Sequence, residues 1–105
     1  MTMKPIVERL KVEVIFDAPL VDVVSDIVTR AGAAGFTIFP ALGGSGRNGR
    51  WSEDDMSAAD TKLLLLTIAT EDAAKKIVSA LEPLLDTYGM IVMTSHVGVV
   101  REGRF

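Results

Sequence analysis

The segment from Gly43 to Trp51, GGSGRNGRW, concentrates glycine and arginine in a chain that is otherwise rich in aliphatic residues. Glycine tolerates positive φ and allows close approach to the backbone, so that successive N–H groups can converge on an anion. Arg47 and Arg50 can add forked hydrogen bonds to the oxygens of the same anion. The segment therefore predicts either an anion site or a connection whose glycines only supply flexibility, and composition does not separate the two.

Two nucleotide-binding patterns match this segment in spacing only. Gly44, Gly46 and Gly49 spell G-x-G-x-x-G, but the following RWSEDDMSAAD lacks the apolar stripe of the helix that receives a pyrophosphate in a dinucleotide fold. We therefore treat this match as a coincidence. The P-loop spacing also fits, but Arg50 and Trp51 replace the phosphate lysine and the magnesium hydroxyl, which excludes a P-loop ATPase.

Composition indicates one domain, spanning residues 1–105, since 49% of the residues are hydrophobic and 24% are charged. A mean hydropathy of +0.34 is high for so short a chain, and it predicts apolar surface in a subunit interface of a homo-oligomer. The net charge of -3 argues against nucleic acid as a partner. The absence of cysteine fits a cytoplasmic protein, and neither a signal peptide nor a membrane-inserted segment is expected.

The first half of the chain predicts a strand, a helix and a second strand. Alternation over 10–16 indicates a half-buried strand. A helix over 18–31 would be capped by Asp17 and ended by Gly32. The β-rich stretch 35–42 contains Pro40, which places Pro40 at an edge or at the end of a strand.

The second half repeats this order. The apolar stretch 62–70 predicts a central strand that is covered on both faces, which would require a partner subunit on one of them. Thr70 is the expected cap of a second helix, with Pro83 at a kink or in the last turn, and 90–101 predicts the last strand. The result is an α+β, ferredoxin-like βαββαβ fold: an antiparallel sheet, both helices on one face, and a long loop at about 43–61 between the second and third strands.

The segment RAGAAGFTIFPALGGSGRNGRW, the closing VVREGRF and this element order resemble the PII-like signalling family, and above all its carboxysome-associated, inorganic-carbon-linked branch. The resemblance implies a single PII-like domain that forms a homotrimer. It also implies that adenine nucleotides bind in clefts between subunits and that the long loop, called the T-loop, contacts a transporter, an enzyme or another protein.

The resemblance also assigns nucleotide contacts to individual residues. GSGRN matches the family's Gly-x-Gly-Arg-Gln phosphate turn, GFT matches the G-x-T that meets the adenine, and the C-terminal arginines close over the phosphates. The implied nucleotide-binding residues are Gly35, Thr37, Gly44, Gly46, Arg47, Asn48, Lys62, Gly89, Arg101 and Arg104. Arg47, Arg50 and Trp51 are the expected contacts to a further anion or to a partner protein, since an aromatic residue on a polar loop is a good anchor.

The turn TYGM departs from the family's Gly-Asp-Gly-Lys, because it keeps Gly89 and places Met90 where a phosphate lysine is expected. Losing one cation weakens a triphosphate most, so we expect ADP or AMP to bind more tightly than ATP, with bicarbonate as a second ligand in the carbon-linked branch. The competing hypothesis is a ferredoxin-like domain, ACT-like or CutA-like, that binds a small molecule or a metal without nucleotide. No pair of nucleophile and base is apparent, so an enzyme is not expected.

Overall fold

The computed structural model of the chain describes residues 5–46, 49–52 and 61–100. In chain order the elements are strand β1 (Val7–Asp17), the 3-10 turn η1 (Ala18–Leu20), helix α1 (Val21–Arg30), strands β2 (Thr37–Pro40), β3 (Gly43–Gly46), β4 (Gly49–Ser52) and β5 (Lys62–Ala69), helix α2 (Glu71–Tyr88) and strand β6 (Ile91–Val99). Apart from the small β3–β4 hairpin, this is the predicted βαββαβ order.

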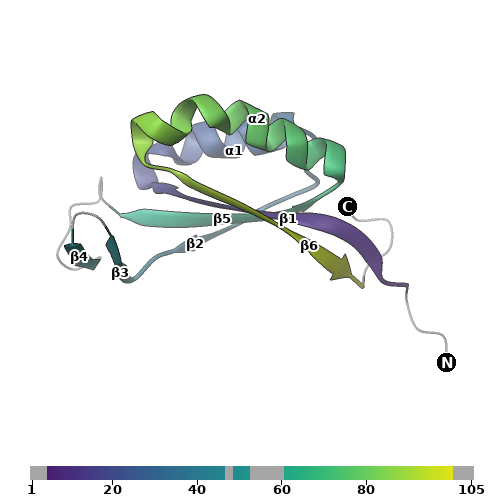
Figure 1. Cartoon of the computed structure of the whole chain (residues 1–105), viewed down its shortest axis with the longest axis horizontal. Helices are drawn as coiled ribbons and strands as arrows, with labels where there is room; N and C mark the ends of the chain where they lie inside the picture. Colours follow the sequence, from purple (N-terminus) through teal and green to yellow (C-terminus); the bar gives the residue numbers. More distant parts are fainter. Residues whose placement is uncertain (1–4, 47–48, 53–60, 101–105) are drawn as a thin grey trace.

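The main sheet has the strand order β2-β5-β1-β6, and every neighbouring pair is antiparallel. Helices α1 and α2 lie on the same face of this sheet (Figure 1), which confirms the ferredoxin-like α+β fold. Pro40 is the last residue of the edge strand β2, where its missing N–H costs no ladder hydrogen bond. Strand β5 lies in the interior of the sheet, as its apolar sequence predicts.

The core lies between the helices and the sheet. It follows the period of two in the strands, because alternate residues of β1 and β5 point toward the helices, and the period of 3.6 in α1 and α2. Met90, two residues after the end of α2, completes it with 6% of its surface exposed. The buried hydrophobic residues are Val12, Val14, Phe16, Val24, Val28, Leu65, Ala69, Ala73, Ala74, Ile77, Leu81 and Met90.

The helix ends are set by local chemistry, with two differences from expectation. The side chain of Thr70 accepts a hydrogen bond of 3.2 Å from the N–H of Ala73, so the predicted cap of α2 is confirmed. Gly32 follows α1 with φ of 97°, a conformation that favours glycine. Asp17 makes no cap hydrogen bond, because its carboxylate binds Lys62 instead. Pro83 lies inside α2, which continues to Tyr88, so it does not mark the final turn.

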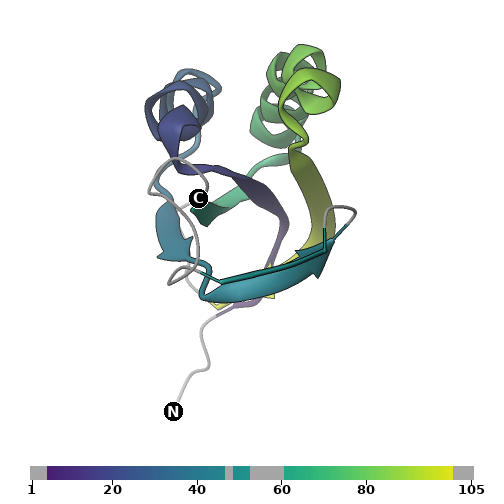
Figure 2. The same cartoon turned by 90° about the vertical axis from the view of Figure 1, so that its left-hand side faces the viewer.

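The sheet face away from the helices, here called the open face, carries apolar residues on all four strands beside the charged residues Lys11 and Glu13 of β1. Cross-strand register places Phe39 opposite Leu64, Leu64 opposite Ile15, and Ile15 opposite Ile91, one residue from each strand. Phe39 and Ile91 are 46% and 51% exposed at the two edges of this row. The two helices lie on the opposite side of the sheet, and the β3–β4 strands, at one end of the sheet, are drawn on the side of the open face (Figure 2).

Candidate functional site

The glycine-rich segment forms the β3–β4 hairpin at one end of the main sheet (Figure 1). Register pairs Gly46 with Gly49, and Gly49 has φ of 96°, so glycine is required there for its backbone conformation. Gly43–Gly46 is extended and exposed. Because successive N–H groups of an extended strand point to opposite sides, β3 does not converge its amides on one anion. The cradle predicted for Gly44, Gly46, Arg47 and Asn48 stays a prediction, because Arg47 and Asn48 lie outside the described residues.

The structure describes some of the residues expected to contact an anion or a partner near this hairpin and leaves others outside the described residues. Arg50 is exposed on β4, and its backbone pairs with that of Ser45. The backbone of Trp51 pairs with that of Gly44. Arg47 and Asn48, expected in the phosphate turn, and Arg101 and Arg104, expected to close over the phosphates, lie outside the described residues.

Lys62, the first residue of β5, stands where the chain enters the sheet from the long loop. Register places it directly opposite Asp17, the last residue of β1. Its Nζ donates a short hydrogen bond to Oδ1 of that carboxylate, and the two side chains are 30% and 35% exposed. Lys62 thus lies at the same end of the sheet as the hairpin, with an acidic partner already in place.

Gly89 belongs to this end as well, at the turn between α2 and β6. It adopts the left-handed conformation with φ of 61°, and its N–H donates to the carbonyl of Leu85 to close the helix. The next side chain, Met90, is buried in the core. The segment TYGM, which resembles the family's Gly-Asp-Gly-Lys, therefore forms a turn at Gly89. The side chain at position 90 packs in the core and carries no charge.

Gly35 and Thr37 lie farther along the sheet. The carbonyl of Gly35 accepts a hydrogen bond of 2.5 Å from Oγ1 of Thr67, a buried residue of β5. Thr37 begins the edge strand β2, is exposed, and pairs with Leu66. Since Leu66 is four residues beyond Lys62, and a strand rises about 3.3 Å per residue, Thr37 is about 13 Å from the level of Lys62.

The predicted nucleotide residues that the structure describes therefore form two separate groups in one subunit. Gly44, Gly46, Lys62 and Gly89 gather at the end of the sheet where β1 finishes. Gly35 and Thr37 lie toward the other end of the sheet. Thr37 begins the edge strand β2, and Gly35 lies just before it. Within one subunit, Thr37 and Lys62 stand at levels of the sheet about 13 Å apart.

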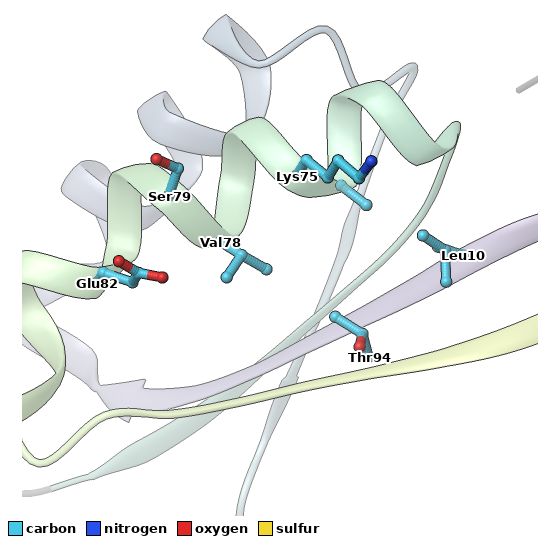
Figure 3. Close-up of a pocket in the computed structure, with 7 residues that line it drawn as sticks. Leu10, Lys75, Val78, Ser79, Glu82 and Thr94 are labelled. Carbon is cyan, nitrogen blue, oxygen red and sulfur yellow. The ribbon is translucent and has the colours of Figure 1, made fainter.

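The structure contains a groove that the sequence did not predict, between α2 and the edge of the sheet at β6 (Figure 3). Its volume is about 250 Å³. The lining residues are Leu10, Ala74, Lys75, Val78, Ser79, Glu82 and Thr94. It combines an apolar floor with two charged residues at its rim, of which Lys75 pairs with Glu71 at 3.3 Å. No predicted site residue lines it.

Two further features bear on the class of site. Among residues 5–46, 49–52 and 61–100, no three His, Cys, Asp or Glu side chains gather where they could hold a metal ion. In the same described part of the chain, neither helix combines the length and apolar character needed to cross a bilayer.

Known proteins agree with this architecture. A solved structure of CPII, a nitrogen regulatory PII-like protein from Thiomonas intermedia K12 bound to ADP, AMP and bicarbonate, superposes with a TM-score of 0.86 at 22% identity, over 95% of each chain. A PII-like signaling protein from Thermus thermophilus gives 0.81 at 27% identity, over 96% of this chain and 98% of that one. The GlnK–ATP complex of B. subtilis gives 0.61 at 11% identity, over 86% of this chain and 82% of GlnK.

Comparison of the sequence itself gives the family. No curated protein sequence matches the chain. The family model described as nitrogen regulatory protein P-II, however, matches residues 9–104. Because this match covers nearly all of the chain, the chain belongs to the nitrogen regulatory protein P-II family, as the resemblance of its motifs predicted.

Proposed function

We propose that this protein is a homotrimeric PII-like regulator that binds ADP or AMP in clefts between subunits, with bicarbonate as a second ligand. It regulates a protein of inorganic-carbon uptake or metabolism through the T-loop at about 43–61. The whole chain, residues 1–105, acts as one PII-like domain in the cytoplasm. Proteins of this family are signalling regulators rather than enzymes, and we assign no catalytic residue.

The observation that carries this proposal is the separation of the predicted nucleotide residues within one subunit. The hairpin glycines, Lys62 and Gly89 lie at one end of the sheet, whereas Thr37 lies about 13 Å farther along it. Both groups are accessible from the exterior, since Gly44, Thr37 and Gly89 are exposed. A second copy that presents its Gly35 and Thr37 to the first copy's hairpin would complete one ligand site from two subunits.

The open face supports association of copies. Its apolar row of Phe39, Leu64, Ile15 and Ile91 crosses all four strands. Burying apolar surface contributes about 25 cal/mol per Å², so a row of four large side chains provides a substantial driving force. Association through this face would bring the sheets of neighbouring copies into contact and leave the helices on the outer surface.

The choice of ligand follows from two observations. CPII, which has the same fold, is described as bound to ADP, AMP and bicarbonate. In the present chain Met90 is buried in the core and supplies no cation at the turn after α2. One missing cation costs most where the ligand charge is greatest, so ADP and AMP are favoured over ATP.

The first test is titration calorimetry of the purified protein with AMP, ADP and ATP, each with and without bicarbonate, combined with a molar mass from light scattering. We expect a trimer that binds ADP or AMP more tightly than ATP, and more tightly still with bicarbonate. A trimer that binds none of the three nucleotides would contradict the proposed function while leaving the family assignment intact. Tightest binding of ATP with magnesium would contradict the ligand preference alone.

A substitution in the expected phosphate turn tests the assignment of residues. Arg47→Ala should weaken ADP binding by roughly 1.5 to 3 kcal/mol, the contribution of a charge-assisted hydrogen bond, without changing the molar mass of the assembly. Arg30→Ala is the matched control, because it removes one arginine from α1, where Arg30 pairs with Asp26 at 3.0 Å on the outer surface. Equal affinities of the two variants would remove Arg47 from the site.

A further inference from the structure

The ion pair between Asp17 and Lys62 occupies the junction between the sheet and the T-loop. Asp17 ends β1 and Lys62 begins β5, and the two residues are direct cross-strand neighbours. The strand ladder continues past them, because the N–H of Ala18 donates to the carbonyl of Thr61 at 2.8 Å. The N–H of Ala41 donates to the carbonyl of Lys62 at 3.0 Å, so both stems of the loop are tied to this point.

The carboxylate of Asp17 is therefore a direct partner of the ammonium group of Lys62. The backbone around Asp17 is that of a helix cap, with φ of -73° and ψ of 137°, yet its side chain makes no cap hydrogen bond and is directed to Nζ of Lys62. Both side chains remain about one third exposed. In the isolated subunit, an anion arriving from solvent can thus reach Lys62 without unfolding any part of the sheet.

We infer, on the basis of the proposed function, that Asp17 competes with the bound nucleotide's phosphates for Lys62 and so determines how tightly the site holds an anion. Partly exposed ion pairs contribute little to stability, which makes this pair exchangeable. A phosphate carries more negative charge than a carboxylate and offers more acceptor oxygens, so it can replace Asp17 as the partner of the ammonium group. The exchange takes place at the base of the T-loop, where it alters a contact that holds the stem.

The test compares ADP affinity by calorimetry in the wild-type protein and in Asp17→Asn, which keeps the size of the side chain and removes its charge. We expect Asp17→Asn to bind ADP about two- to fivefold more tightly, since an ion pair of this exposure is worth roughly that factor. The gain should disappear in the double variant Asp17→Asn with Lys62→Gln, relative to Lys62→Gln alone. Asp17→Ser, which keeps a cap-forming side chain, repeats the test with a second substitution.

Asp26→Asn is the matched control. It makes the same chemical change and the same change in net charge, and it breaks the ion pair with Arg30 on the outer surface of α1. If Asp17→Asn and Asp26→Asn bind ADP equally, or if the gain persists without Lys62, competition by Asp17 is wrong although nucleotide binding stands. If the wild-type protein does not bind ADP at all, the proposed function fails first and the inference with it.

Discussion

Both faces of the four-stranded sheet carry large apolar side chains, but these have different surroundings. On the face toward the helices, Val12, Val14 and Leu65 are completely buried. On the open face, Ile15 and Leu64 are only partly buried, and Ile91 is 51% exposed. The same alternating strands therefore make one face that the subunit covers by itself and one face whose apolar surface remains accessible.

This difference separates folding from association. The residues of the covered face pack against α1 or α2, so their burial stabilises the isolated subunit. The open face gains its energy only when something else excludes water from it. Substitutions on the two faces should therefore be distinguished by how their effects depend on protein concentration.

The largest expected effect is on the covered face. Leu65→Ala removes a side chain with no exposed surface, and we expect it to lower the free energy of unfolding by about 2 to 5 kcal/mol. Denaturant titration at several protein concentrations measures this. The loss should be the same at each concentration, since the cavity lies inside one subunit; a loss that vanishes on dilution would place Leu65 in an interface.

A smaller effect is expected at the open face. Ile91→Thr keeps a β-branched residue in β6 but adds a polar group, and it should weaken association by about 1 to 2 kcal/mol per subunit. In a dilution series followed by sedimentation or light scattering, the variant should dissociate into lighter species at a higher protein concentration than the wild-type protein does. An unchanged dissociation profile would contradict the use of this face in assembly.

Side-chain periodicity predicted most of the fold because it depends on which residues face the core. Alternation in β1 and the apolar stretch that became β5 identified strands, and Thr70 identified the start of α2 from local hydrogen bonding alone. The β3–β4 hairpin could not be found in this way, since its glycines carry no side-chain pattern and its pairing depends on the backbone. The cap at Asp17 was wrong because a cross-strand partner 45 residues away took its carboxylate.

The candidate site was predictable in residue type more than in arrangement. Gly89 was recognised as the residue kept from the family's turn, and it does adopt positive φ. That Gly35 and Lys62 stand at different levels of the sheet required the register, which no local pattern specifies. The α2–β6 groove was missed for a related reason: it depends on where α2 packs across the sheet, and periodicity gives only the face that a helix buries.

The next expected effect concerns the helix that covers one face. Thr70→Ala removes the acceptor for the N–H of Ala73, and it should lower the free energy of unfolding by about 1 kcal/mol. Thr70→Asn restores an acceptor at the same position and should recover most of the loss in the same urea titration. Equal stability of the alanine and asparagine variants would show that the cap contributes nothing measurable.

The smallest effect in the isolated subunit is expected for an ion pair on the open face. Lys11 and Glu13 lie two residues apart on β1, 3.4 Å from each other, with apolar cross-strand neighbours such as Leu66 and Met93. In dissociated subunits Glu13→Gln should cost about 0.2 to 1 kcal/mol, as for other accessible pairs. In the assembly the cost should rise, because removing one partner of a desolvated pair leaves an uncompensated charge.

The measurement compares the free energy of unfolding of Glu13→Gln with that of the wild-type protein at concentrations below and above those at which the subunits assemble. A cost that does not change with concentration would mean that Lys11 keeps its access to water, and that the apolar rows beside it are not covered by another subunit.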